Sequence, residues 1–291
     1  MPVSTRQVHF AGSAIAIQAD GAAARRLVDF LFGELPEHGA PPPRLTYRLE
    51  AGDQPGRFSL HLGETCLLRE ARPAQAAARL MDRACFHLAD TSQDGLLLHA
   101  ALLSWQGQGL LLPGSSGRGK STLSAWLVQQ GFDYLTDELA YIPSGATAAF
   151  GLRRPLNIKS VARPLLEALV GPPGIDDRED ILRSSGSYMT AVQALRPGAA
   201  AVASVPVRWI VFPAYQAGIG LEVEALSRAR CGLALMEGLI NARNLPGHGL
   251  DEIGRLARQA PAWKIRYEGF EVFRRHGAND DGPAFLECIA S

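Results

Sequence analysis

Several features are scarce in this sequence, and each absence excludes a class of protein. The chain has 291 residues. It contains no uninterrupted apolar run near the roughly 18 residues that indicate a membrane span. The N-terminal segment lacks the long apolar run of a signal peptide. Lysine plus arginine and aspartate plus glutamate both number 29, so no basic excess indicates a nucleic-acid partner. We therefore expect a cytoplasmic protein that binds neither membranes nor nucleic acid.

Cysteine is scarce too. The four cysteines, Cys66, Cys85, Cys231 and Cys288, are far apart and form no CxxC pair, which argues against a zinc site. In a chain of this size they are typical of reduced, buried thiols. Hydrophobic residues make up 47% and charged residues 20%, an ordinary globular composition. The length then predicts one large domain or a core domain that carries a smaller one.

Residues 1–94 are predicted to form a small α+β subdomain. Alternating apolar residues predict strands, and apolar residues at helical spacing predict helices. The expected strands cover 6–18, 45–49, 58–62 and 66–68, the helices 21–34 and 73–90, and a proline-rich loop lies over 38–43. This part carries no chemical motif, so its role is unknown, and a packing or docking module is the simplest interpretation.

Residues 95–291 are predicted to form an α/β domain. Its start is clear: an apolar strand over 96–103, a turn, a second strand over 110–112, a helix over 121–130 and a strand over 134–136. Further strands are expected over 139–160, 207–212, 221–225 and 262–267, and helices over 161–170, 227–243 and 250–259. Residues 171–190, rich in Gly, Pro, Asp and Ser, are predicted to be a mobile loop.

A phosphate-binding loop follows the second of these strands. The segment fits G-x-x-x-x-G-K-[ST], and a chain of this length would match by chance only about once in a hundred times. An apolar strand precedes it and a helix follows, as the motif requires. Glycines let backbone N–H groups turn toward phosphate oxygens, Lys120 adds a positive charge, and the Ser121 hydroxyl can bind Mg²⁺. The loop consists of Gly114, Ser115, Ser116, Gly117, Arg118, Gly119, Lys120, Ser121 and Thr122.

Two further positions are candidates for chemistry. Asp137 and Glu138 end the strand after the loop helix, where a carboxylate can hold Mg²⁺ or accept a proton. A solvated acidic turn is the plain alternative. His99 interrupts an apolar strand shortly before the loop, and a lone histidine there is more often a core residue than a catalyst. It gains interest because the strand over 96–103 is expected to pair with the strand that enters the loop.

Taken together, these residues resemble a known family. The segments 98–101 and 112–122, and then Gly131 through Glu138, resemble the kinase domain of bacterial HPr kinase/phosphorylase, which is similar to phosphoenolpyruvate carboxykinases. The segments 154–159, 209–213 and 241–244 look like HprK-related kinases of type A. The resemblance covers roughly residues 90–270. It implies an α/β (α+β mixed) P-loop kinase core, with the small α+β subdomain in front of it.

The resemblance also implies roles for individual residues. His99 stands at the position of an active-site histidine, and Lys120 and Ser121 match the loop lysine and the Mg²⁺-binding serine. Asp137 matches the carboxylate that accepts a proton during phosphorylation, and Glu138 stands where the family has a second aspartate and is expected to help hold metal. Arg208 is the best candidate for the family's later catalytic arginine. The expected cofactors are ATP and Mg²⁺.

One departure affects the expected chemistry. The family has a metal-binding glutamate three residues before an arginine that Arg154 could match, but residue 151 is glycine. Three hypotheses follow: an ATP-dependent kinase for a serine in a protein or peptide, a nucleotide-binding switch or scaffold without transfer activity, and a kinase for a small molecule such as free serine. The HPr kinases it resembles are hexamers, so the resemblance implies a homo-oligomer as well.

Overall fold

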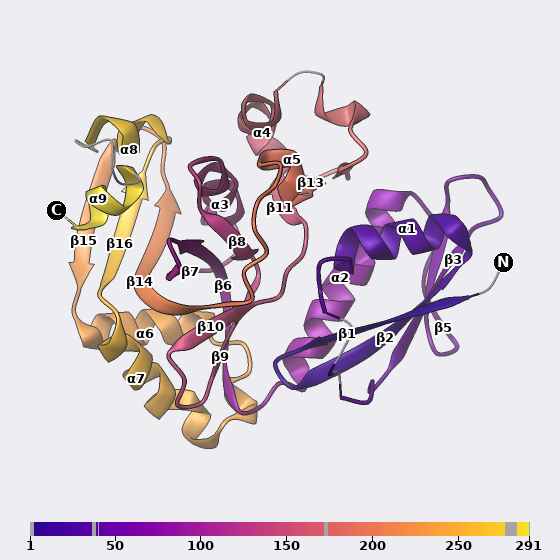
Figure 1. The fold of residues 1–291 in the computed structure, drawn as a ribbon, viewed down its shortest axis with the longest axis horizontal. Coiled ribbons are helices and arrows are strands. Elements are labelled where there is room, and N and C mark those ends of the chain that lie inside the picture. The colour runs from indigo at the N-terminus through magenta and orange to yellow at the C-terminus, as the bar shows by residue number, and fades with distance from the viewer. Residues whose placement is uncertain (1–2, 37–38, 40, 172–173, 277–283, 291) are drawn as a thin grey trace. The chain divides into compact units, whose positions relative to one another are not determined.

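The computed structural model describes residues 3–36, 39, 41–171, 174–276 and 284–290 (Figure 1). These residues form a mixed α/β protein with three sheets. The chain divides into two compact units. The first combines Met1–Asp94 with Leu152–Gly198, and the second combines Gly95–Gly151 with Ala199–Ser291. Residues 152–198, predicted from the sequence as part of the second domain, thus group with the first unit.

The N-terminal part of the first unit is a five-stranded sheet with two helices packed on it. The strands lie in sequence order, β1 to β5, and the β2–β3 pair is parallel because α1 connects these strands. Both α1 and α2 contact β2 and each other. The elements are β1 (Ser4–Phe10), β2 (Ser13–Asp20), α1 (Gly21–Phe32), β3 (Thr46–Ala51), β4 (Phe58–Leu62), β5 (Thr65–Ala71) and α2 (Pro73–Asp90).

The prediction of a single strand over residues 6–18 was wrong. The chain turns at Ala11 and Gly12, so β1 and β2 form a hairpin in which Phe10 pairs with Ser13. Both turn residues have positive φ, 50° and 77°. Glycine adopts this conformation readily and alanine does not, which is why the sequence carries only a weak turn signal here. The proline-rich segment 38–43 lies partly outside the described residues, and its described part contains no helix or strand.

The second part of the first unit, residues 152–198, corrects another prediction. The expected mobile loop over 171–190 contains two strands, β12 and β13. β13 pairs with both β11 and β12 in a three-stranded antiparallel sheet of order β11-β13-β12. Its strands are short, so their apolar alternation is too brief to detect. The elements are β11 (Leu156–Lys159), η1 (Ser160–Ala162), α4 (Arg163–Val170), η2 (Ile175–Asp177), β12 (Ile181–Arg183), β13 (Ser187–Thr190) and α5 (Val192–Leu195). Arg153 joins this part to the N-terminal part through Glu34, with Nε 2.7 Å from Oε2.

The second unit is built on an eight-stranded sheet of order β10-β9-β6-β7-β14-β16-β15, with β8 paired to β6. β10 also pairs with β14, so five strands close into a ring. The β7–β14 and β14–β16 pairs are parallel. The elements are β6 (Gly95–Trp105), β7 (Gln108–Pro113), α3 (Lys120–Gln129), β8 (Asp133–Thr136), β9 (Leu139–Pro143), β10 (Ala148–Gly151), β14 (Ser204–Tyr215), β15 (Leu221–Leu226), α6 (Arg228–Gly238), η3 (Ala242–Asn244), η4 (Pro246–Gly249), α7 (Leu250–Gln259), β16 (Ala262–Tyr267), α8 (Glu271–His276) and α9 (Ala284–Ala290).

The core of the second unit explains where His99 points. Along β6, Leu96, Leu98, Ala100 and Leu102 share one apolar cluster with buried residues of α6 and α7. Side chains alternate between the two faces of a strand, so His99 belongs to the opposite face. There it contacts Lys120, the first residue of α3.

Within the described residues, no helix combines the length and apolarity that crossing a bilayer requires. The four cysteines are free thiols, and only Cys231 and Cys288 are buried. The prediction of buried thiols was therefore wrong for Cys66, which is exposed, and for Cys85, which is half-buried. Burial raises the pKa of the Cys231 thiol to about 11.

Candidate functional site

The predicted phosphate-binding loop connects β7 to α3, as the motif requires. Gly114, Gly117 and Gly119 all have positive φ, of 155°, 90° and 92°. At Gly119 a second constraint applies, because a Cβ atom there would lie 3.0 Å from the hydroxyl oxygen of Tyr267. The backbone path thus favours glycine at all three positions, and close packing adds a second reason at Gly119.

The loop ends at the first turn of α3. Gly119 is the N-cap residue and Lys120 the first helical residue, with no acidic side chain in the first turn. The first N–H groups of a helix have no partner within the helix, and together with the helix dipole they form an anion site. The cap has no side-chain hydrogen bond. This is the geometry that a bound phosphate group needs.

Aromatic residues hold α3 in place. Trp126 of α3 stacks on Phe270, with ring centroids 5.0 Å apart, and contacts Phe273 at 5.5 Å. Tyr267, at the end of β16, packs against Phe273 and is buried beside Gly119. Burial raises the pKa of the Tyr267 phenol, so this hydroxyl stays protonated. The helix start and the loop glycine are therefore positioned by one aromatic cluster.

Lys120 folds back over the start of the loop. Its Nζ donates to the carbonyl oxygens of Gly114 and of Ser115, the latter at 3.3 Å, and lies 3.3 Å from Nε2 of His99. The residue is 5% exposed. A buried ammonium group needs such partners, because burial without them is costly. The predicted loop lysine and the predicted active-site histidine thus meet in the structure.

The two carboxylates at the end of β8 have different surroundings. Asp137 is 1% exposed and its Oδ1 accepts a hydrogen bond of 3.0 Å from the hydroxyl of Tyr134. The Glu138 side chain is 36% exposed, and its Oε1 lies 3.5 Å from Nε2 of His99. Thr136 shapes this turn, since its Oγ1 accepts hydrogen bonds from the backbone N–H groups of Glu138 and Leu139. Glu138 is therefore the carboxylate that faces solvent and His99.

His99 links Lys120 to Glu138 through one atom. Its Nε2 contacts both Lys120 and Glu138. A neutral Nε2 can accept a hydrogen bond from the ammonium group, whereas a protonated Nε2 can donate to the carboxylate. It cannot do both at once. The position of the proton on this ring therefore decides which partner His99 holds.

The structure does not bring Arg208 to this cluster. Arg208 lies in β14 at a register shift between Val207 and Trp209, which pair with Gly109 and Leu110 near the start of β7. The loop follows the other end of β7. Each residue of a strand advances the chain by about 3.3 Å, so Arg208 stands roughly 10 Å from Pro113 along the strand. In the described part of the chain, no hydrogen bond or ion pair joins it to the loop.

Gly151, the departure from the family pattern, has a packing reason. A Cβ atom at this position would lie 2.5 Å from the backbone carbonyl carbon and oxygen of Leu135. β10 thus approaches the strand that carries Asp137 so closely that only glycine fits. A glutamate at this position is incompatible with this packing.

Asn241 is a residue whose role the sequence analysis missed. Its buried side chain accepts a hydrogen bond of 3.0 Å from the N–H of Leu97 and donates one of 2.9 Å to the carbonyl of Gly95. The side chain therefore makes the hydrogen bonds to the first part of β6 that the backbone of a neighbouring strand would otherwise make. The sequence analysis noted only that residues 241–244 look like a family segment. That likeness does not say what the Asn241 side chain contacts.

The site offers oxygen donors that suit Mg²⁺, but the described residues do not supply a complete set of protein ligands. Among the described residues, no group of three or more His, Cys, Asp or Glu side chains could hold a metal by itself. Mg²⁺ is commonly held by one or two protein oxygens together with substrate phosphates and water. Ser121 at the loop and Glu138 beside His99 fit this arrangement, and both are at least partly exposed.

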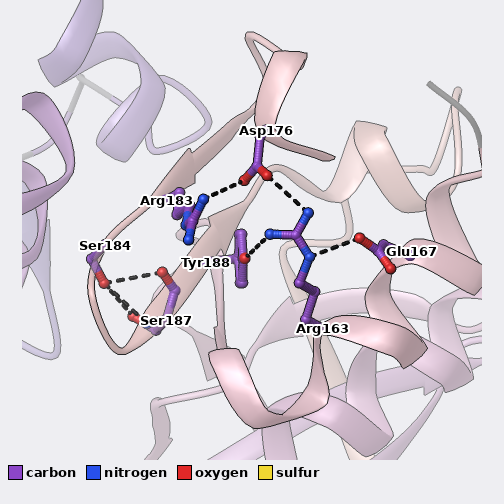
Figure 2. A network of polar contacts seen from close by, with 7 residues as sticks. All are labelled: Arg163, Glu167, Asp176, Arg183, Ser184, Ser187 and Tyr188. Atoms are coloured by element: carbon purple, nitrogen blue, oxygen red, sulfur yellow. Dashed lines mark hydrogen bonds and ion pairs between the residues drawn. The ribbon is translucent and has the colours of Figure 1, made fainter. Parts of the chain in front are cut away.

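A second polar cluster lies in the first unit, around Arg163 (Figure 2). The Arg163 guanidinium donates to Asp176 at 2.8 Å, to Glu167 at 2.7 Å and to the hydroxyl of Tyr188 at 2.7 Å. The hydrogen bond from Arg163 lowers the pKa of Asp176, with a further contribution from Arg183. Every cation of this cluster has a carboxylate partner, so the cluster serves to hold the ends of α4, η2 and β13 together.

Comparisons with known proteins add little to this geometry. No family model matches the chain, and no curated protein matches it. Among solved structures, the Hpr(Ser) kinase/phosphatase from Coxiella burnetii is similar over 67% of this chain and 87% of its own chain. The two are 13% identical, with a TM-score of 0.30. A likeness this distant carries no argument about function.

Proposed function

We propose that this chain is an ATP-dependent kinase that transfers the γ-phosphoryl group to a hydroxyl, that of a serine in a protein or peptide. The observation that carries the proposal is the cluster of Lys120, His99 and Glu138 at the phosphate-binding loop. Phosphoryl transfer uses groups of this kind: a loop lysine, an imidazole that contacts it, and a solvent-facing carboxylate that contacts the imidazole.

Each residue has a distinct task in this reaction. The backbone N–H groups of the loop and Lys120 bind the phosphate oxygens, and Lys120 leaves its carbonyl partners to do so. Ser121 and Glu138 would hold Mg²⁺, which supplies charge neutralisation. The acceptor oxygen bonds to the γ-phosphorus while the bond from that phosphorus to the bridging oxygen breaks and its electron pair leaves with ADP. The hydroxyl proton passes to a carboxylate.

The carboxylate that accepts the proton is either Asp137 or Glu138. The family resemblance favours Asp137, and exposure and the contact with His99 favour Glu138. If Asp137 is the acceptor, Asp137→Asn abolishes transfer while nucleotide still binds, and raising Mg²⁺ restores part of the activity of Glu138→Gln. If Glu138 is the acceptor, Glu138→Gln abolishes transfer and added Mg²⁺ restores nothing.

The experiment that tests the proposal measures label transfer from γ-labelled ATP to serine peptides and to free serine. We expect transfer that depends on Mg²⁺ and falls by about 100-fold or more in Lys120→Ala. This variant removes a positive charge from the place where negative charge develops on the phosphate, and such a loss has effects of this size. Lys159→Ala, an exposed lysine on β11, is the matched control and should retain activity. Unchanged turnover in Lys120→Ala would refute the proposal.

Two observations favour the alternative, a nucleotide-binding switch without transfer activity. Asp137 is buried under Tyr134, and Gly151 replaces a metal-binding glutamate. In that case the same assay shows no transfer to any acceptor, while a separate measurement of ATP binding shows binding that requires Lys120.

A further inference from the structure

A cavity of about 310 Å³ in the second unit borders the phosphate-binding loop. This volume is at the lower end of the range for ligand sites, about 300–1,000 Å³. The cavity is bounded by the loop, the last part of β14, the end of β15, α6 and β16. Its lining consists of Pro113, Gly114, Ser115, Arg118, Phe212, Pro213, Ala214, Leu226, Arg230, Ala234, Glu237 and Lys264.

The cavity lies at the end of the loop that receives the terminal phosphate. Gly114 and Ser115 line it, and their carbonyl oxygens are the ones that accept hydrogen bonds from Lys120 Nζ. In a phosphate-binding loop this ammonium group reaches the β- and γ-phosphates. A ligand in the cavity therefore lies beside the phosphoryl group that is transferred, which is the place of the acceptor.

The end of α6 beside the cavity contacts the backbone of β6. Glu237 lines the cavity, and a Cβ atom on the next residue, Gly238, would lie 3.7 Å from the carbonyl oxygen of His99. The following residue, Leu239, forms a β-bridge with Leu98. The end of α6 thus packs against the backbone of the strand that carries His99.

The charge of the lining is unbalanced. Arg118, Arg230 and Lys264 are cationic, and Glu237 is the one anionic lining residue. Arg230 donates to Glu224, which lies outside the lining, whereas no ion pair joins Arg118 or Lys264 to a carboxylate within the described residues. The hydrogen bond from Arg230, with the charge of Lys264 in support, lowers the pKa of Glu224. Arg230 and Lys264 thus already stabilise the charged form of a neighbouring carboxylate.

We propose that this cavity binds the acceptor as a peptide segment that carries an acidic residue beside the phosphorylated serine. The acidic side chain lies near Arg118 and Lys264, its apolar neighbours pack on Phe212 and Leu226, and the serine points toward the loop. The four charged lining residues are exposed, so the cavity is open and a segment of a longer chain can enter it. This inference rests on the proposed kinase function.

The test measures binding and transfer separately. Binding uses fluorescent peptides in which alanine replaces the serine, one flanked by glutamates and one by lysines. The acidic peptide should bind more tightly, and its affinity should fall with added salt. Lys264→Glu should weaken it by about tenfold or more, and Lys264→Gln should have an intermediate effect. Arg258→Glu, an equal charge change at an exposed position of α7 outside the cavity, should leave the affinity unchanged. Tryptophan fluorescence confirms that each variant is folded.

The outcomes separate this inference from the proposed function. Equal binding of the acidic and basic peptides, or equal effects of Lys264→Glu and Arg258→Glu, overturns the assignment of the cavity even if transfer is observed. Acidic preference that is lost in Lys264→Glu supports the cavity, and absence of transfer to the matching serine peptides then refutes only the kinase activity. Free serine that is phosphorylated as efficiently as the acidic serine peptide overturns the peptide assignment.

Discussion

Replacing Asn241 by alanine tests how the second unit is held together. The Asn241 amide satisfies the N–H of Leu97 and the carbonyl of Gly95, and all of these groups are buried. Truncation leaves two backbone groups of β6 without this partner. A buried group that loses its hydrogen bond costs about 1–3 kcal/mol. A carbonyl oxygen can accept two hydrogen bonds, so the loss at Gly95 should be the smaller of the two. We therefore expect a loss of about 2–4 kcal/mol in the free energy of unfolding.

The assay uses the distribution of tryptophan in this chain. Trp105, Trp126, Trp209 and Trp263 are the four tryptophans, and all belong to the second unit. Urea unfolding followed by tryptophan fluorescence therefore reports on this unit, even if the first unit unfolds separately. With a slope of about 3 kcal/mol per M, the expected loss lowers the midpoint by roughly 1 M urea.

Gln259→Ala is the matched control for this prediction. Its side-chain amide also donates to a backbone carbonyl, that of Thr147 at 3.1 Å, but this bond is exposed. Water can replace it, so the loss should stay below about 1 kcal/mol. If Asn241→Ala is no more destabilising than Gln259→Ala, the two buried bonds do not support β6 and the reasoning fails.

Three further predictions concern packing, the site and pH. Gly151→Ala should destabilise the second unit by about 2 kcal/mol or more in the same urea assay, because its Cβ would overlap the backbone of Leu135; a wild-type midpoint would show that β10 can shift. His99→Gln should reduce the rate of phosphoryl transfer and remove its pH dependence near neutrality while ATP still binds; a lower melting temperature with an intact transfer rate would show a purely structural histidine. Arg163 lowers the pKa of Asp176, so this pair contributes stability above about pH 4 that is lost as pH falls through the lowered pKa. In Asp176→Asn the acid-side loss, measured by circular dichroism, should be smaller, and an unchanged acid profile would contradict this linkage.

The loop and its flanking elements could be predicted because their information is local. Apolar strands before Gly114 and a helix after Lys120 are visible in short windows of sequence, and glycine is needed wherever φ is positive. Elements of more than four residues were mostly predicted close to their observed bounds. Short strands such as β12 were not, because three residues carry no periodicity and their pairing depends on β13.

The sequence by itself determined the phosphate-binding loop, the strands and helix around it, and the residue types that phosphoryl transfer uses. These depend on backbone conformation and on side-chain chemistry, which neighbouring residues decide. Only the tertiary structure decided which groups meet. It placed Glu138 beside His99, left Arg208 at the far end of β7, and made Asn241 a partner of β6. Such contacts join residues far apart in the chain, so they depend on strand order and packing, which no local pattern encodes.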